Sequence, residues 1–292
     1  MKEKILVLGA TGLIGHQVYN YLQRNSNYEV YNISYRNKLT PDSIIQDARD
    51  ESQFLKKILN IKPHFIVNCI GVLINDSNIN RENAIFLNSY LPHRLSRLAD
   101  EIFAKLIHIS TDCVFSGKKG RPYTETDFKD GESFYAKTKA LGEVVSEKHL
   151  TLRTSVLGPE LKINGEELFH WFMCQSEDIF GFTKDFWSGV TSYELAKAIH
   201  WSIANNISGL YHVTNNSSIS KYEILKLFKK HTKKNISIKP VDGNCLNKSF
   251  LDTRKLINYV IPSYDEMIFD MISLVAEDKS LYSQYKVDGF EK

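Results

Sequence analysis

The sequence predicts an α/β fold: a doubly wound parallel sheet joined to a smaller C-terminal lobe. Short apolar runs alternate with helix-like segments over about the first 150 residues, which is typical of a parallel sheet flanked by helices. The first apolar run, at residues 5–8, is continuous, as expected for a strand buried on both faces. A length of 292 residues accommodates one large domain of this kind with an appendage.

The first part of the chain is expected to contribute most of the sheet. Strands are expected at residues 5–8, 28–34, 64–71, 105–111 and 150–155. Helices are expected between them, at residues 13–22, 50–60, 81–103 and 135–148. Strands that alternate with helices in this way pair in parallel.

The regular alternation of strands and helices ends after residue 155. The expected elements are a loop and helix over residues 157–175, a helix at 191–205, a short strand at 209–214 and a capped helix at 218–231. The polar last residues, 276–292, are expected to be loosely held. We expect residues 156–292 to form mainly a substrate-binding lobe, with the segments near 186–215 returning to the first domain.

Composition excludes several classes of partner. The formal net charge is only +3 and the basic residues are scattered, so neither nucleic acid nor a membrane surface is expected as a partner. The apolar runs are too short to span a bilayer, and the chain enters its first strand without a signal peptide, which indicates a cytoplasmic protein. The four cysteines lack metal-binding spacing, so no metal site is expected.

Glycines at positions 9, 12 and 15 lie directly between the first strand and the first helix. In a turn of this kind one glycine permits the tight bend, one lets the backbone approach a pyrophosphate, and one lets the helix pack on the sheet. Free N–H groups at the helix start then bind the anion. Residues 1–155 are therefore expected to be a Rossmann-type dinucleotide-binding domain. Its expected phosphate-binding residues are Gly9, Thr11, Gly12, Leu13, Ile14 and Gly15.

The end of the second strand indicates which dinucleotide is preferred. A carboxylate at this point selects the ribose 2′-hydroxyl of NAD, but the segment "NISYRN" carries Arg36 instead. An arginine can hold a 2′-phosphate through two hydrogen bonds. We therefore expect NADPH as the cofactor, with NADH tolerated; the alternative is that Arg36 is a solvated surface residue.

The spacing Gly-x-x-Gly-x-x-Gly resembles that of the extended short-chain dehydrogenase/reductases. The resemblance implies further cofactor contacts in the same order along the chain. It places Asp47 and Ala48 near the adenine, and Asn88 in a structural role that bridges Lys139 through water. The stretch "NCIG" resembles the family's "NCAA" beside the nicotinamide ribose, which implies contacts from Cys69, Ile70 and Gly71.

Three later blocks resemble the dTDP-4-dehydrorhamnose reductase family. They are "STDCVFSG…RPYTETD", "FYAKTKALGE" and "LTLRTSVLG". The resemblance implies that Tyr135 donates a proton to a carbonyl oxygen that the hydroxyl of Thr111 polarises. Lys139 follows Tyr135 by one helical turn, so its charge is expected to lower the pKa of the phenol and its amine to bind the nicotinamide ribose. Asp112 either orients the site or serves only as a turn residue.

The match departs from the family around the sugar. Cys113 stands in place of a tyrosine, Val156 in place of a tryptophan, and "GVLIND" in place of "AYTxVD". These changes favour a different sugar, for instance a UDP-linked 4-keto-6-deoxy-N-acetylhexosamine. Glu167 and Trp171 are further candidates for contacts in the second lobe. The expected substrate-binding residues are Val72, Thr111, Asp112, Cys113, Arg153 and Trp187.

The leading hypothesis is an NADPH-dependent enzyme that reduces the 4-keto group of a nucleotide-activated 4-keto-6-deoxy sugar for surface polysaccharide. A second is an epimerase or dehydratase of the same fold. A third is a non-catalytic regulatory subunit, because the same fold serves as the partner subunit of methionine adenosyltransferase in some organisms. The sequence is also compatible with a homodimer.

Overall fold

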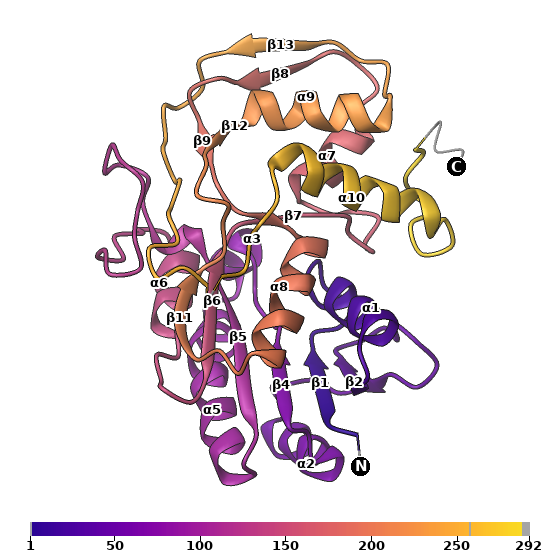
Figure 1. Cartoon of the computed structure of the whole chain (residues 1–292), viewed down its shortest axis with the longest axis vertical. Helices are drawn as coiled ribbons and strands as arrows, with labels where there is room; N and C mark the ends of the chain where they lie inside the picture. The colour runs from indigo at the N-terminus through magenta and orange to yellow at the C-terminus, as the bar shows by residue number, and fades with distance from the viewer. Residues whose placement is uncertain (1, 257, 288–292) are drawn as a thin grey trace.

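The computed structural model describes residues 2–256 and 258–287. Its centre is a sheet of seven parallel strands in the order β11-β6-β5-β4-β1-β2-β3 (Figure 1). The strands are β1 (Lys4–Leu8), β2 (Glu29–Ser34), β3 (Ile44–Ile45), β4 (Phe65–Asn68), β5 (Lys105–Thr111), β6 (Leu150–Thr154) and β11 (Gly209–His212). The strand order changes direction between β1 and β4. This confirms the doubly wound parallel sheet that the sequence predicts.

Helices cover both faces of the sheet because the strands are apolar on both sides. Ile5 and Val7 of β1 pack with the helices α1 and α8, while Leu6 and Leu8 pack with α2 and α5. This alternation follows from the two-residue repeat of a strand. The covering helices are α1 (Gly15–Asn25), α2 (Glu51–Ile61), α5 (Leu91–Glu101) and α8 (Ser192–Ala204).

Two of the predicted helices differ from the structure in their details. The helix expected at residues 81–103 consists of α4 (Arg81–Ala84), a π-helical stretch η1 (Ile85–Tyr90) and α5. The helix expected at residues 135–148 is α6 (Phe134–Leu141) and is shorter than predicted. It ends at Gly142 because the next residue, Glu143, turns into the core to pair with Arg153.

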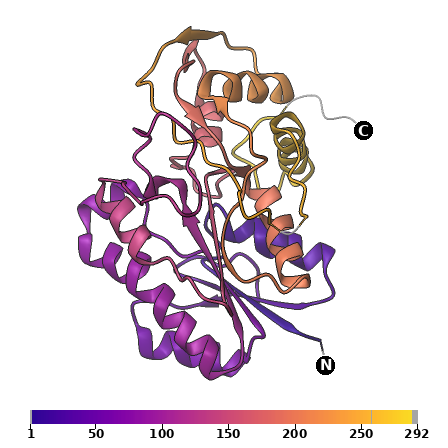
Figure 2. The same cartoon turned by 60° about the vertical axis from the view of Figure 1, so that its left-hand side comes forward.

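Residues after 155 build a second lobe above the carboxyl ends of the strands, as Figures 1 and 2 show. Residues near 190–212 return to the first domain, since α8 packs against α1 and β11 extends the sheet beside β6. Short strand pairs and helices complete the lobe. They are β7 (Val156–Leu157), α7 (Leu168–Cys174), β8 (Ile179–Phe182), β9 (Phe186–Trp187), β10 (Val190–Thr191), β12 (Ile219–Ser220), α9 (Lys221–Thr232), β13 (Ile238–Val241) and α10 (Tyr264–Glu277). Two short elements of the first domain, α3 (Ile74–Ile79) and η2 (Asp112–Val114), pack against α6.

The start of α9 carries the capping arrangement that the sequence predicts. The hydroxyl of Ser220 accepts from the backbone N–H of Glu223, and the Glu223 carboxylate accepts from the backbone N–H of Ser220. This reciprocal pair satisfies two amide groups that have no partner inside the helix.

The prediction that the C-terminal residues are loosely held is wrong for residues 278–287. Tyr282 and Tyr285 are buried, at 1% and 8% exposed, and both pack in the main hydrophobic core. Their aromatic rings provide enough apolar area to hold an otherwise polar segment. Residues 288–292, to which the prediction also applied, lie outside the described residues.

No helix within the described residues is long and apolar enough to cross a membrane. Across the same described ranges, no three His, Cys, Asp or Glu side chains gather closely enough to hold a metal ion. All four cysteines are free thiols.

Candidate active site

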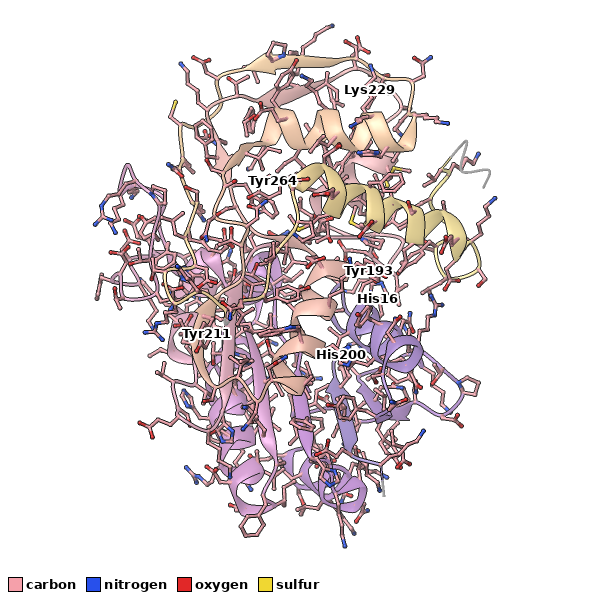
Figure 3. All side chains as sticks on the ribbon, viewed as in Figure 1. His16, Tyr193, His200, Tyr211, Lys229 and Tyr264 are labelled. Atoms are coloured by element: carbon pink, nitrogen blue, oxygen red, sulfur yellow. The ribbon has the colours of Figure 1, made fainter. Side chains whose placement is uncertain are left out.

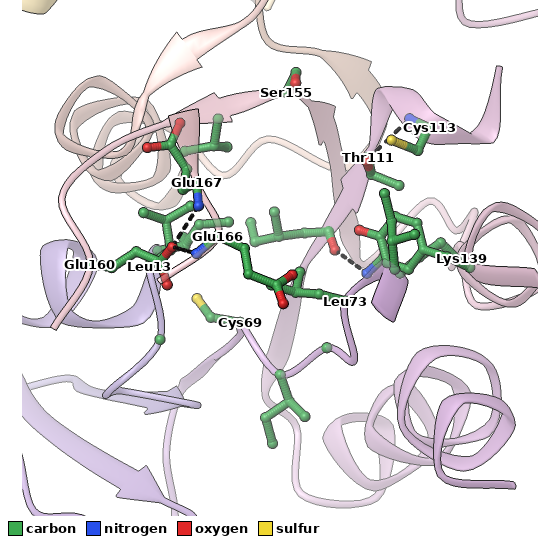
Figure 4. A pocket seen from close by; sticks show the side chains of 18 of the residues that line it. Leu13, Cys69, Leu73, Thr111, Cys113, Lys139, Ser155, Glu160, Glu166 and Glu167 are labelled. Atoms are coloured by element: carbon green, nitrogen blue, oxygen red, sulfur yellow. Dashed lines mark hydrogen bonds between the residues drawn. The ribbon is translucent and has the colours of Figure 1, made fainter. Parts of the chain in front are cut away.

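A cavity of about 390 Å³ lies at the carboxyl ends of the central strands, where the strand order changes direction (Figure 4). Open α/β sheets bind their ligands at this position. The first domain contributes the floor and the second lobe contributes one wall. The lining residues are Thr11, Gly12, Leu13, Ile14, Cys69, Ile70, Gly71, Leu73, Ile74, Asp76, Ile109, Ser110, Thr111, Asp112, Cys113, Tyr135, Lys139, Thr154, Ser155, Val156, Glu160, Leu161, Lys162, Glu166 and Glu167.

The glycine turn is shaped for close backbone approach. Gly9 has a φ of +76°, which favours glycine, and a Cβ on Gly15 would lie 2.2 Å from the carbonyl oxygen of Gly9. These two glycines form the turn and the helix packing rather than the cavity surface. The residues between them, Thr11 to Ile14, line the cavity. The turn therefore has the form of the phosphate cradle that the sequence predicts.

The end of β2 carries a cluster of charge outside the cavity. The guanidinium of Arg36 lies 4.4 Å from the centre of the Tyr35 ring, and that of Arg49 lies 5.2 Å from the same ring. Arg49 also pairs with Asp47, which lowers the pKa of that carboxyl. Ala48 is buried in the core behind them. Sequence reasoning missed Arg49, although it stands in the same "QDARD" stretch as Asp47.

Some residues after the end of β4 line the cavity, and others are held behind it. Cys69, Ile70 and Gly71 line the cavity, and burial raises the pKa of the Cys69 thiol to about 12. Asn88 is fully buried behind them. Its side chain accepts from the Val72 backbone N–H at 2.8 Å and donates to the Val72 carbonyl at 3.0 Å. Asn88 therefore supports the backbone of Val72 from behind the cavity, and neither residue is among those that line it.

The predicted catalytic residues gather on one side of the cavity. Tyr135 and Lys139 come from α6, whose first turn is capped by the Ser133 hydroxyl. Thr111 ends β5, and its hydroxyl donates to Asp112 at 3.2 Å. The structure thus brings together side chains from two segments of the sequence, with Thr111 and Lys139 both visible in Figure 4.

Burial sets the protonation of this cluster. It raises the pKa of the Tyr135 phenol, with smaller contributions from Cys113 and Asp112, so the expectation that Lys139 lowers this pKa is wrong. Burial lowers the pKa of Lys139 to about 8, against the attraction of Glu143, and its amine donates to the Ile109 carbonyl at 2.8 Å. Burial also raises the pKa of Asp112. The phenol is therefore the protonated, acid form at neutral pH.

Besides Val72, two residues predicted to contact the substrate do not line the cavity. Arg153 is 2% exposed and forms two hydrogen bonds of 2.8 Å with Glu143, because a charge buried in the sheet requires a partner. Trp187 packs against Tyr264 and donates to the Ser155 hydroxyl at 2.7 Å. Trp187 therefore positions the hydroxyl of Ser155, which does line the cavity.

The wall opposite the catalytic cluster is acidic. Glu160 accepts from the backbone N–H groups of Glu166 and Glu167 at 2.7 and 2.8 Å. Glu167 caps α7 through Phe169, and burial raises the pKa of its carboxyl to about 8. Of the second-lobe candidates, Glu167 lines the cavity and Trp171 does not. The sequence contained no motif that pointed to Glu160 or Glu166.

A parallel sheet that opens on a glycine turn and carries tyrosine and lysine one helical turn apart is the architecture of the extended short-chain dehydrogenase/reductases. These proteins are NAD(P)-dependent oxidoreductases. The chain belongs to the RmlD substrate binding domain family, whose family model matches residues 3–249. This confirms the resemblance inferred from the sequence.

Relatives differ in their described activities. The chain is 27% identical over 232 residues to a dTDP-4-dehydrorhamnose reductase from Aggregatibacter actinomycetemcomitans, covering 75% of this chain and 76% of the relative. It is 34% identical over 165 residues to the methionine adenosyltransferase 2 subunit beta of Bos taurus, covering 55% and 48%.

Solved structures support the fold. A dTDP-4-dehydrorhamnose reductase from Bacillus anthracis in complex with NADP has a TM-score of 0.78 at 23% identity, covering 93% of this chain and 99% of that one. A UDP-glucose 4-epimerase from Thermotoga maritima has a TM-score of 0.76 at 20% identity, covering 94% and 99%. At these identities the likeness establishes the architecture alone.

Proposed function

We propose that this protein uses NADPH to reduce the 4-keto group of a nucleotide-activated 4-keto-6-deoxy sugar, for surface polysaccharide biosynthesis. The observation that carries the proposal is the meeting of Thr111, Tyr135 and Lys139 in one cavity that also reaches the glycine turn. The reductases among the relatives support the same substrate class. The first 155 residues and the segments near 186–215 would bind the dinucleotide, and residues 156–292 mainly the sugar.

The glycine turn fits the cofactor, because Gly12 lines the cavity without a side chain and lets a pyrophosphate approach the backbone. Residues Thr11 to Ile14 would hold the pyrophosphate through backbone N–H groups. Arg36, with Arg49 beside it, would receive a 2′-phosphate, which favours NADPH over NADH. When bound, NADPH supplies the hydride that the sugar carbon accepts.

The chain's own residues supply the proton and the polarisation. Tyr135, protonated at neutral pH, donates its phenolic proton to the 4-oxygen of the sugar, and Thr111 donates a hydrogen bond to the same oxygen. Lys139 binds the ribose of the cofactor and positions it, since its amine lies in the same cavity. Hydride at carbon and a proton at oxygen together convert the ketone to an alcohol.

Small side chains favour a sugar other than 4-dehydrorhamnose. Cys113 and Val156 line the cavity where the reductases resembled in sequence carry tyrosine and tryptophan. Their smaller volume suits a bulkier substituent, such as the N-acetyl group of a UDP-linked 4-keto-6-deoxy-N-acetylhexosamine.

The test is the oxidation of NADPH, followed by absorbance, with a panel of dTDP- and UDP-linked 4-keto-6-deoxy sugars. Tyr135→Phe should lower kcat by about 100-fold or more, the usual contribution of a general acid, with an unchanged melting temperature. Tyr90→Phe, an exposed tyrosine outside the cavity, is the matched control. Near-normal turnover by Tyr135→Phe would contradict the proposed mechanism.

A second candidate is a regulatory subunit, favoured by the 34% identity to methionine adenosyltransferase 2 subunit beta. An epimerase of the same fold is the other alternative, and it would interconvert sugar nucleotides without net consumption of NADPH. If the protein binds NADPH but none of the sugar nucleotides in the panel leads to NADPH oxidation, one of these alternatives is supported. Product analysis by chromatography separates them.

A homodimer is a further expectation of this proposal. Ile85, Leu141 and Val145 are 51%, 70% and 70% exposed. Such side chains are typical of a surface that a second subunit covers. Size-exclusion chromatography with light scattering measures the oligomeric state directly.

A further inference from the structure

The chain that follows α10 forms a loop next to α1, as the yellow segment in Figure 1 shows, and Figure 3 places His16 in this region. Residues 278–287, which we call the C-terminal segment, bury two tyrosines there, Tyr282 and Tyr285. Each tyrosine hydroxyl reaches a different side of the dinucleotide cavity through a short series of hydrogen bonds. Neither tyrosine lines the cavity itself.

Tyr282 connects to the glycine turn through His16. The Nδ1 atom of His16 lies 2.7 Å from the carbonyl oxygen of Gly12, which can only accept, so Nδ1 carries the proton. Burial lowers the pKa of His16 to about 4, so Nε2 is a bare acceptor at neutral pH. The Tyr282 hydroxyl lies 2.9 Å from Nε2 and therefore donates to it, while it accepts from Gln17. This series ends on Gly12, a residue that lines the cavity.

Tyr285 connects to the acidic wall through Glu160. Its hydroxyl accepts from the Glu160 backbone N–H at 3.0 Å and lies 2.7 Å from Nδ1 of His170. The Glu160 carboxylate in turn holds the backbone N–H groups of Glu166 and Glu167. One end of the C-terminal segment thus supports the glycine turn, and the other supports the wall that faces it.

We propose that the C-terminal segment is a clamp on the dinucleotide site, in which Tyr282 and Tyr285 are positioning residues that hold Gly12 and Glu160 in their binding arrangement. A buried series with fixed donors and acceptors allows one arrangement of the groups at its end. Cofactor binding and docking of the segment therefore stabilise each other, and the coupling is reciprocal. The inference rests on the dinucleotide site of the proposed function and is independent of the sugar.

The experiment measures the dissociation constant of NADPH by isothermal titration calorimetry, with no sugar present. The variants are Tyr282→Phe, Tyr285→Phe and the double variant, each of which keeps the aromatic ring and removes the hydroxyl. We expect the double variant to bind NADPH about tenfold more weakly, the effect of one to two lost hydrogen bonds. Tyr19→Phe is the matched control, since Tyr19 is buried on α1 and its hydroxyl accepts a hydrogen bond from Gln23 of the same helix.

Hydrogen exchange of the wild-type chain provides a measurement that does not depend on the variants folding. NADPH should slow exchange at the amides of Leu281 and Tyr285, which donate within the segment, more than at amides of α9. Unchanged exchange in the segment on binding would overturn the clamp. So would a double variant with a lower melting temperature and unchanged NADPH affinity, because that result indicates a merely structural role. A wild-type chain that binds no NADPH would instead refute the dinucleotide site.

Discussion

Replacing Lys139 with methionine is expected to abolish reductase activity and yet stabilise the folded protein. Lys139 is 5% exposed, and burial lowers its pKa from 10.5 to about 8. At about 1.4 kcal/mol per pKa unit, the folded state loses about 3 kcal/mol at neutral pH by holding this charge. Methionine is of similar length and carries no charge. It would also lose the hydrogen bond to the Ile109 carbonyl, which costs about 1 kcal/mol, so a net gain of about 2 kcal/mol is expected.

The dependence on pH provides an independent check of the same reasoning. Below about pH 8 the amine is protonated in both the folded and unfolded chains, and the destabilisation is fully present. Between about pH 8 and 10.5 the unfolded chain binds more protons, so the stability of the wild type rises with pH. Lys139→Met lacks this titration. The advantage of the variant should therefore shrink and disappear within this window, and above it the variant should be about 1 kcal/mol less stable than the wild type because it lacks the hydrogen bond to Ile109.

Urea denaturation of the cofactor-free proteins at pH 7 and pH 10, followed by circular dichroism, measures both effects. Lys137→Met, at an exposed position on the same helix, should change stability by less than about 0.5 kcal/mol. A Lys139→Met protein that is less stable than the wild type at pH 7 would refute the reasoning. An advantage that stays constant from pH 7 to pH 10 would refute it too.

Other variants test the framework around the site. Arg153→Met should lower the free energy of unfolding by about 3–5 kcal/mol in urea titrations, because it leaves Glu143 buried without its bidentate partner; the added change Glu143→Leu should restore most of the loss. Gly15→Ala should abolish detectable NADPH binding by calorimetry, since its Cβ would meet the carbonyl of Gly9, and normal affinity would contradict the structure of the turn. Ser220→Ala should cost about 1 kcal/mol of stability through the lost helix cap, with an unchanged KM for NADPH; an altered KM would show that the cap acts on the site.

The sheet and its glycine turn were predictable because their signals are local. A buried strand and a turn of three glycines both depend on neighbouring residues, so β1, β5 and the start of α1 match their predictions closely. That Tyr135 and Lys139 both line the cavity was predictable for the same reason, because residues four apart share a helix face.

Only the tertiary structure decided which side chains are buried and which residues, distant in sequence, they contact. Nothing near Arg153 in the sequence showed that Glu143 would neutralise it, and nothing near Tyr135 showed that burial would raise the pKa of its phenol. The prediction for the C-terminal segment was wrong because the segment is mostly polar and the hydrogen-bond partners of its two buried tyrosines lie 266 and 125 residues away in the sequence. The sequence by itself determined the glycine turn, the sheet and the side chains that are proposed to react. The electrostatic setting of those groups came from the fold, because desolvation is a property of everything packed around an atom and not of its neighbours along the chain.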